Sequence, residues 1–401
     1  KYMDLEQEAY NVLAKDIQSQ PGYKGASFGQ KLDSFRYLMM LGNPKTQVKN
    51  IAGNVLFGKL TNLKDDIGAL IETAADRANK ASGGEGIQRT KSILNPLSES
   101  DKKLVSASKE YGEEYAARAL SGNKYTNPGV ELDKALSTFG NGKVGRFVQS
   151  LSDLTTKSLD KADQNAMMNK YQNALARYVK ANGKDISIFS DSSQEAKDFL
   201  SMASDYAVHQ AEEAAFHQDS NLASWLTRSA TMLKNGNIGD KAAATLLDAT
   251  VPFKNTPINV FKSCLQYSPA EYLYAFADAY KLHRGEIDAA KFIDDMAKAT
   301  TGTTMCVIGS ILAHAGIVQI GSDKGVKEQN TDTRTGRQQM AVKIGRHYVN
   351  LSDLVPAASP LVIGATMYEA FKKNGKGIDA LVDGLLNVES GLVDTPMLSG
   401  L

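Results

Sequence analysis

The feature that most constrains this fold is an uncharged run in the last quarter of the sequence. No residue from 299 to 322 carries a formal charge when His314 is neutral. A helix that spans a bilayer needs about 20 mostly apolar residues, so the run is long enough for that role. It is nevertheless rich in Thr, Gly, Ser and Ala and poor in Leu and Ile. Three alternatives follow: a buried core helix, a conditionally inserted or interfacial helix, and a constitutive membrane span.

Glycine recurs every seventh residue within this run, at Gly302, Gly309 and Gly316. A stripe of small residues on one helix face allows close approach of two helices, in lipid or in a water-soluble bundle. A second run without formal charge covers 354–368, but two prolines interrupt it. We expect the segment 354–371 to pack against 303–320, with Gly309 and Gly316 at the contact.

The modest hydropathy of the first run favours a fold that is soluble in water and carries a latent membrane-active element. In that case the larger apolar residues of the run are the ones that would meet lipid. The candidate membrane-interaction residues are Ile308, Ile311, Leu312, Ile317 and Val318.

Helical periodicity recurs through most of the chain, and alternating strand patterns are scarce. The exception is Gly345-Arg346, which separates two partly alternating segments, 337–344 and 347–353. A two-residue loop with glycine first suits a type II′ turn. The sequence therefore predicts a mainly α fold, an extended multi-helix assembly with one small β-hairpin near 338–352. A brief extended piece is expected within 182–191.

Two helix starts combine a capping residue with proline. Asn43 precedes Pro44, and Thr256 precedes Pro257. Asn and Thr side chains can accept a hydrogen bond from the free N–H groups of a helix start, and proline in the first turn loses no bond. We expect helices to begin at both places.

The clearest interior boundary is KNGNIGDK (234–241), where glycine and asparagine cluster. We expect an N-terminal helical region over 1–235 and a C-terminal region over 241–401 that contains the apolar helices and the hairpin. The chain begins within an amphipathic helical pattern and without an initiator Met. We therefore expect it to be a fragment of a longer polypeptide.

Composition argues against several classes of protein. Apolar residues make up 42% and charged residues 23%, which is ordinary for a soluble protein. The net charge of +1 argues against a general polyanion binder. Cys264 and Cys306 each lie in an apolar setting and are expected as core residues. The sequence lacks GxSxG, P-loop, HExxH and strand-linked GxGxxG motifs, so we expect neither an enzyme nor a cofactor.

A few residues have two interpretations. His209, Glu213 and His217 recur every four residues on an expected helix, a spacing that suits metal ligands but is also common on a solvated face. His314 is expected to be neutral and hydrogen-bonded, with a pH-sensing role as the alternative. Trp225 is expected to be a packing anchor.

A mildly basic stretch carries Lys45, Lys49, Lys59 and Lys64, with Phe57 nearby. We expect a solvated face there. A nucleic-acid surface is the alternative, because lysines and an aromatic ring together can bind phosphates and bases.

Several stretches together resemble large polyvalent proteins encoded by tailed phages and prophages. NPKTQVKNIAGN (43–54) is similar to an NPxTxxxNxxGN segment, and PFKNTPINVFKSCLQYSP (252–269) to a PFxxTPxNxxxxxxxYSP segment. Segments 283–303 and 340–371 continue the likeness. The positions that match are Asn43, Pro44, Asn50, Gly53, Asn54, Pro252, Phe253, Thr256, Pro257 and Asn259, which we interpret as capping and packing positions.

The resemblance implies a non-catalytic structural module of an internal or ejection-type virion protein that assembles with itself and with other virion proteins. Its location would be the virion and, after delivery, the host envelope or cytoplasm. The host membrane and phage DNA are further candidate partners. The alternative is a soluble helical scaffold that links enzymatic domains and has no membrane role. A nucleic-acid-directed or metal-dependent enzyme unit is a third interpretation.

Overall fold

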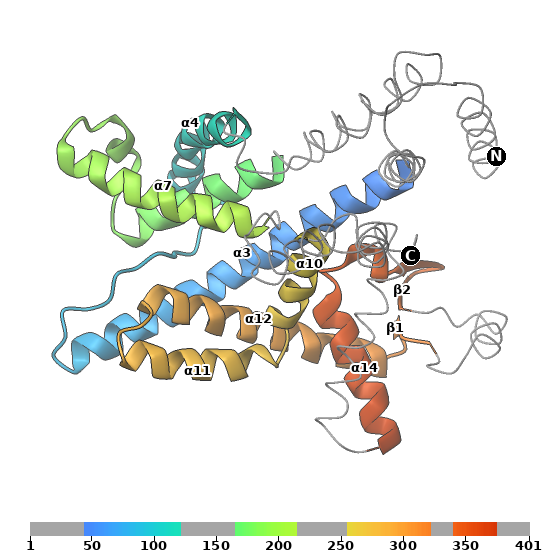
Figure 1. Cartoon of the computed structure of the whole chain (residues 1–401). Coiled ribbons are helices and arrows are strands. Elements are labelled where there is room, and N and C mark those ends of the chain that lie inside the picture. Colours follow the sequence, from blue (N-terminus) through green and yellow to red (C-terminus); the bar gives the residue numbers. More distant parts are fainter. Residues whose placement is uncertain (1–43, 122–164, 215–254, 322–339, 375–401) are drawn as a thin grey trace, which may run out of the picture. The chain divides into compact units, whose positions relative to one another are not determined.

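The computed structural model describes residues 44–121, 165–214, 255–321 and 340–374 (Figure 1). The chain divides into two compact units. One consists of residues 1–48 and 122–164, of which only 44–48 are described. The other contains every remaining described residue, so the helices that build the candidate site belong to it.

The first helices of this unit surround a small apolar core. Helix α3 (Pro44–Ala81) begins at the expected proline, and α4 (Glu99–Ser121) begins with two acids that suit the positive end of the helix dipole. Residues 165–181 form a further helix, followed by the 3-10 helix η1 (Ile186–Ser190) and α7 (Gln194–Ala214). The larger buried side chains of this core include Leu104, Tyr171, Leu175, Tyr178 and Leu200.

The second group of helices is arranged along α12 (Ala289–His314). It contains α10 (Asn255–Gln266), α11 (Glu271–His283) and α14 (Ser359–Asn374). Helix α11 contacts α12 and lies beside its first half, and α14 contacts α12 along its second half (Figure 1). Asp288 caps α12 by accepting a hydrogen bond from the backbone N–H of Lys291, at 2.7 Å.

A three-stranded antiparallel sheet follows α12. Strand β2 (Ala341–Ile344) pairs with both β1 (Val318–Gln319) and β3 (His347–Asn350). Gly345 has φ of +62°, and Arg346 is not among the residues with positive φ, as a type II′ turn requires. The mainly α prediction and its hairpin are therefore confirmed, and β1 is an additional strand.

Two local predictions are wrong. Residues 186–190 are helical instead of extended, because the Asp185 side chain accepts hydrogen bonds from the backbone and hydroxyl of Ser187 and starts a tight turn. The uncharged run is not one continuous helix. Helix α12 ends at His314, Gly316 has φ of +71°, and the remaining residues lead into β1.

Other predictions lie outside the described residues. These are the interior boundary at 234–241, Trp225, and the motif positions Asn43, Pro252 and Phe253. Thr256 and Pro257 lie in the first turn of α10, which begins at Asn255.

Candidate functional site

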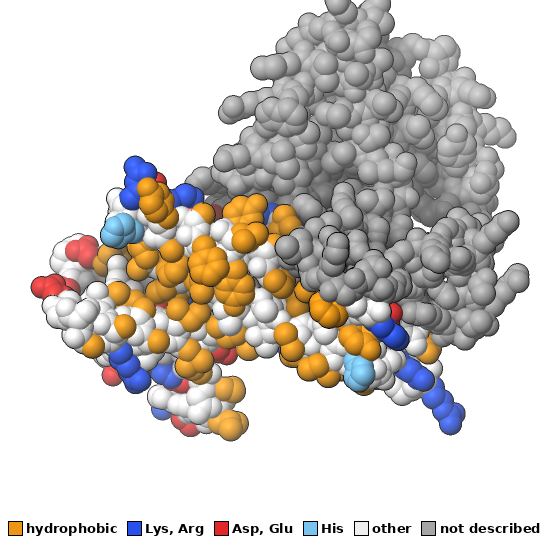
Figure 2. All heavy atoms as spheres, turned by 90° about the horizontal axis from the view of Figure 1, so that it is seen from below, with side chains coloured by type: hydrophobic (Ala, Val, Ile, Leu, Met, Phe, Trp, Pro, Cys, Tyr) orange, Lys and Arg blue, Asp and Glu red, His pale blue; other side chains and the backbone are white. Residues whose placement is uncertain are grey.

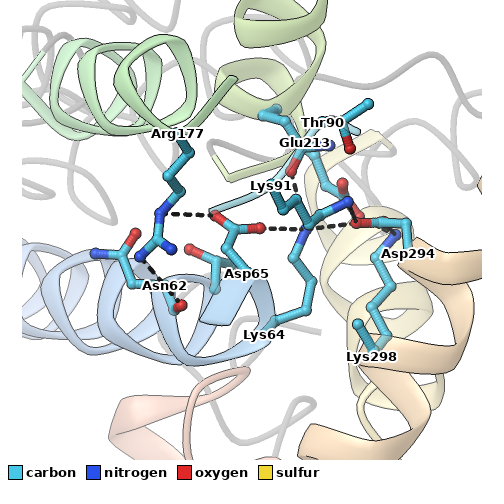
Figure 3. Close-up of polar contacts among 12 residues, drawn as sticks. Asn62, Lys64, Asp65, Thr90, Lys91, Arg177, Glu213, Asp294 and Lys298 are labelled. Carbon is cyan, nitrogen blue, oxygen red and sulfur yellow. Dashed lines mark hydrogen bonds and ion pairs between the residues drawn. The ribbon is translucent and has the colours of Figure 1, made fainter. Parts of the chain in front are cut away.

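A buried network of charged side chains joins five segments of the chain. Its centre is Asp294 on α12, around which Figure 3 shows the ammonium groups of Lys64, Lys91 and Lys298. The Nζ atoms lie 2.8, 3.1 and 2.9 Å from the Asp294 carboxylate oxygens. Lys298 also pairs with Glu213 of α7. Helix α12 is thereby tied to α3, to the segment after α3, and to α7.

A second carboxylate, Asp65 of α3, extends the network to the helix 165–181. It accepts a hydrogen bond from Lys170 at 2.6 Å and lies 3.1 Å from Lys64. Arg177 lies 3.9 Å from Asp65 and forms a closer pair, at 2.5 Å, with Asp66. Asp65 and Asp294 therefore share Lys64 as a partner.

The segment after α3 is held by a third buried carboxylate. Glu72 accepts hydrogen bonds from the backbone N–H groups of Thr90 and Lys91, at 2.9 and 2.8 Å, and one from the Thr90 hydroxyl. These bonds fix the backbone beside Lys91, whose side chain then reaches Asp294. The position of one central lysine thus depends on an anchor that lies 19 residues earlier on α3.

Burial and pairing act in opposite directions on these groups. Burial alone would raise the pKa of Asp294, but Lys298, Lys64 and Lys91 outweigh it and hold the pKa well below its usual value. Burial likewise opposes the charge of Lys64, and Asp294 and Asp65 hold its pKa above the usual range. Asp294 and Lys64 are therefore ionised at neutral pH, whereas burial lowers the pKa of Lys170 to about 8. The paired charges hold the helices together electrostatically.

The local sequence of α3 explains why a lysine lies inside. Phe57, Leu60 and Lys64 are spaced by three and four residues and share one helix face. Phe57 and Leu60 are buried, with the Phe57 ring edge-on to Tyr267 at 5.7 Å, so Lys64 enters the same interior. The expected solvated basic face is wrong at this position, where only 1% of Lys64 is exposed.

The other two lysines of that stretch with described side chains have different surroundings. Lys49 pairs with Asp353, and Lys59 is exposed. The described lysines therefore do not form one phosphate-binding surface.

Beside the network lies a cleft of about 710 Å³. Lys91, Glu213, Asp294 and Lys298 line it from the network side. Helix α11 contributes the opposite side with Glu271, Tyr274, Asp278 and Lys281. The lining carries acids and bases in similar numbers, so the cleft is polar without a dominant charge.

The α11 side of the cleft holds two carboxyls in contrasting environments. Hydrogen bonds from Lys281 and Lys291, at 2.7 and 2.5 Å, lower the pKa of Asp278 to about 2. Burial, with a contribution from the nearby Asp295, raises the pKa of Glu271 to about 7. Glu271 therefore titrates near neutrality while Asp278 stays ionised.

Helix α11 turns its charged side inward and its apolar side outward. The buried positions are Glu271, Ala275 and Asp278. Leu273, Phe276 and Tyr280 occupy the opposite face and are 73%, 66% and 64% exposed. This reverses the usual arrangement of a surface helix, whose apolar stripe faces the core. The sequence analysis did not single out this face, although its spacing of three and four residues is visible in the sequence.

The expected membrane-interaction residues fall in different places. Ile308, Ile311 and Ile317 are exposed. Leu312 is partly buried and Val318 is buried against the core shared by α12, α14 and the sheet. The sequence run therefore does not present its apolar residues as one lipid-facing element.

The glycine stripe is divided in the same way. A Cβ atom at Gly302 would lie 2.2 Å from the Tyr267 carbonyl carbon, and one at Gly309 would lie 2.3 Å from the Leu361 carbonyl oxygen of α14. Gly316 does not lie at a helix contact, since nothing is within 4 Å of its Cβ position. It ends α12 through its positive φ, which glycine adopts at little cost.

The histidine hypotheses change with the structure. Glu213 pairs with Lys298 instead of a metal, and His217 lies outside the described residues. Within the described ranges, no group of three or more His, Cys, Asp or Glu side chains is arranged to hold a metal ion. His314 is exposed at the end of α12, and its Nδ1 lies 2.9 Å from the Tyr368 hydroxyl, so it is hydrogen-bonded but not buried.

The remaining candidates lie on helices. Gly53 is buried and Asn54 half-buried on α3. Asn50 and Asn259 lie within α3 and α10, respectively. Cys264 and Cys306 are free thiols inside the core, as expected.

No described helix combines the length and the hydropathy that a membrane span requires. No protein-family model, curated protein or solved structure matches this chain.

Proposed function

We propose that this chain is a non-catalytic structural module of a phage virion-carried protein of the internal or ejection type. The module assembles with itself and contacts the host membrane during DNA delivery. The support from sequence is the order and spacing of the NPxTxxxNxxGN and PFxxTPxNxxxxxxxYSP segments. The support from structure is a row of exposed leucines on one face of α3.

The observation that carries self-assembly is a leucine stripe on α3. Leu56, Leu63 and Leu70 are 39%, 40% and 60% exposed. They are seven residues apart and therefore lie on one face of the helix, as apolar positions do where two helices pack along their length. The buried network holds the opposite side of α3 through Lys64 and Asp65. The clamped helix thus presents a preformed stripe to a second copy or to another virion protein.

The location and further partners follow from the same proposal. The protein travels in the virion and reaches the host envelope or cytoplasm after delivery. Phage DNA is a weaker candidate partner, since the net charge is only +1 and Lys64 is buried.

A soluble scaffold that links enzymatic domains is the second candidate function. The buried charge network favours it, because an ionic clamp between five segments would keep a spacer rigid. This alternative requires neither self-assembly nor contact with lipid.

Sedimentation velocity distinguishes the two functions. The triple variant Leu56→Gln/Leu63→Gln/Leu70→Gln should sediment as a monomer at concentrations where the unchanged chain forms oligomers. Leu97→Gln, which changes an exposed leucine outside α3, is the matched control and should leave the oligomers intact. A chain that is monomeric at all concentrations supports the scaffold instead. Mass spectrometry of purified particles of the encoding phage tests virion location separately.

A further inference from the structure

We propose that the outward faces of α11 and of the last turns of α12 form one surface that binds an anionic lipid bilayer. This inference rests on the proposed membrane contact and assigns it to particular side chains. It places the lipid contact mainly on α11, and from the uncharged run 299–322 it takes only exposed residues in the last turns of α12.

The first argument is the reversed polarity of α11. Its only acidic residues, Glu271 and Asp278, are turned toward the protein. Its outward face consists of Leu273, Phe276, Ala277 and Tyr280, all exposed and none charged. A tyrosine such as Tyr280 suits the headgroup level of a bilayer, where the ring is apolar and the hydroxyl remains hydrated, while Leu and Phe reach the acyl boundary.

The second argument is that α12 continues the same surface. Thr300 faces α11, since the Tyr272 hydroxyl donates a hydrogen bond to its Oγ1, at 3.1 Å. Val307 and Ile311 lie seven and eleven positions further along and therefore share that face of α12. Both are exposed, as is Ile308 beside them. Figure 2 shows hydrophobic side chains gathered over the face seen from below, where α11 lies.

The third argument is the charge around the surface. Two exposed cationic side chains lie at the end of α11: Lys281, whose partner Asp278 is turned inward, and Arg284, which also pairs with the exposed Glu286 at 2.9 Å. Arg284 also lies over the Tyr280 ring, with 5.7 Å from the guanidinium carbon to the ring centroid. An apolar centre with cations at its margins complements anionic headgroups. If two copies paired through this surface across a twofold axis, the cationic side chains of one copy would face those of the other and repel them.

Binding in this way needs no membrane-spanning helix and no unfolding of the core. The charged side of α11 keeps its pairs with Lys281 and Lys291 and its place over the polar cleft. Only side chains that are already exposed would enter the lipid. The surface therefore suits shallow, reversible attachment in the interface.

Co-sedimentation of the full chain with phosphatidylcholine–phosphatidylglycerol vesicles tests the proposal. The double variant Leu273→Gln/Phe276→Gln should bind about tenfold or more weakly, because each large apolar side chain loses its burial in lipid. Ile308→Gln/Ile311→Gln should weaken binding by a smaller factor. Leu56→Gln/Leu63→Gln on α3 is the matched control and should bind like the unchanged chain. Circular dichroism verifies that each variant is folded.

A separate variant tests the contribution of the cationic side chains. Lys281→Gln/Arg284→Gln should weaken binding to the anionic vesicles and leave residual binding to pure phosphatidylcholine unchanged.

Three results would overturn the proposal, and they differ in meaning. Unchanged binding of the Leu273→Gln/Phe276→Gln variant would place the membrane contact elsewhere and leave the proposed function intact. A chain that ignores both vesicle types would reject membrane contact altogether. Loss of oligomers in the same variant, together with absence of vesicle binding, would assign the surface to a second copy of the chain.

Discussion

In its first half, α12 meets its neighbours through Asp294 and Lys298, whose partners are charged groups of α3, α7 and the segment after α3. In its second half the same helix contacts α14 at glycine positions, where the two backbones approach each other closely. A Cβ at Gly309 would lie 2.3 Å from the Leu361 carbonyl oxygen, and one at Gly364 would lie 1.8 Å from that of Cys306. The Ser310 hydroxyl donates to the Gly364 carbonyl at 2.7 Å across this contact.

The two halves place different demands on the sequence. A buried charge must keep every partner, since an uncompensated ion in the interior costs several kcal/mol. A glycine contact needs no partner but leaves no room for an added carbon. The first half therefore depends on residues that are distant in sequence, whereas the second depends on two small positions.

The largest effect is expected from Asp294→Asn. The change leaves Lys64, Lys91 and Lys298 without their shared carboxylate, and removal of one partner from a buried pair costs about 3–5 kcal/mol. Urea denaturation measures the loss. Glu286→Gln, at an exposed carboxylate near the start of α12, is the control and should change the stability little. Equal stability of both variants would mean that the network is not a clamp.

Gly309→Ala and Gly364→Ala should each destabilise the chain by about 1–3 kcal/mol, as overpacking does. The physical reason is that each added Cβ meets backbone atoms, which cannot rotate away. Gly58→Ala is the matched control on α3, where nothing lies within 4 Å of the Cβ position. It should stabilise the chain by about 0.5–1 kcal/mol, because alanine loses less entropy in a helix. Stabilisation by all three changes would argue against a close contact of α12 and α14.

Glu271→Gln should change the stability of the chain in a pH-dependent way. The pKa of Glu271 is raised from 4.5 to about 7, so the fold disfavours its ionised form. Its contribution to stability is complete below pH 4.5 and is lost as the pH rises toward and through 7. At pH 8 the variant should be more stable than the unchanged chain by about 1 kcal/mol or more. Melting curves at pH 5 and 8 measure this, and a constant difference at both would contradict it.

The smallest effect is expected from Lys102→Gln, which breaks an exposed pair. Lys102 and Glu99 lie 2.7 Å apart on α4, with side chains 52% and 75% exposed. An exposed pair contributes about 0.2–1 kcal/mol, which high salt screens. Comparison of this loss with that of Asp294→Asn at low and high salt separates the buried network from surface charge. If the two variants lost similar stability with similar salt dependence, the buried network would be no different from a surface ion pair.

Local chemistry in the sequence predicted the helix start at Pro44, the hairpin turn at Gly345 and the core cysteines, because each depends on adjacent residues. The charged network was missed because its pairs join residues far apart, such as Lys64 and Asp294, which are 230 positions apart. One signal was present, since Lys64 continues the apolar stripe of Phe57 and Leu60. The end of α12 at His314 was missed because a lack of charged residues does not show where a helix ends. In the structure, Gly316 with its positive φ follows that end.

Hydrogen exchange along α12 tests the difference between its halves most directly. The amides of α12 are followed in Asp294→Asn and in Gly309→Ala under conditions where both variants remain folded. Asp294→Asn should speed exchange chiefly at 292–301, beside the lost ionic contacts, and Gly309→Ala chiefly at 305–314 and in α14. The same exchange pattern in both variants would contradict the account, because it would mean that α12 is held as a single unit along its whole length.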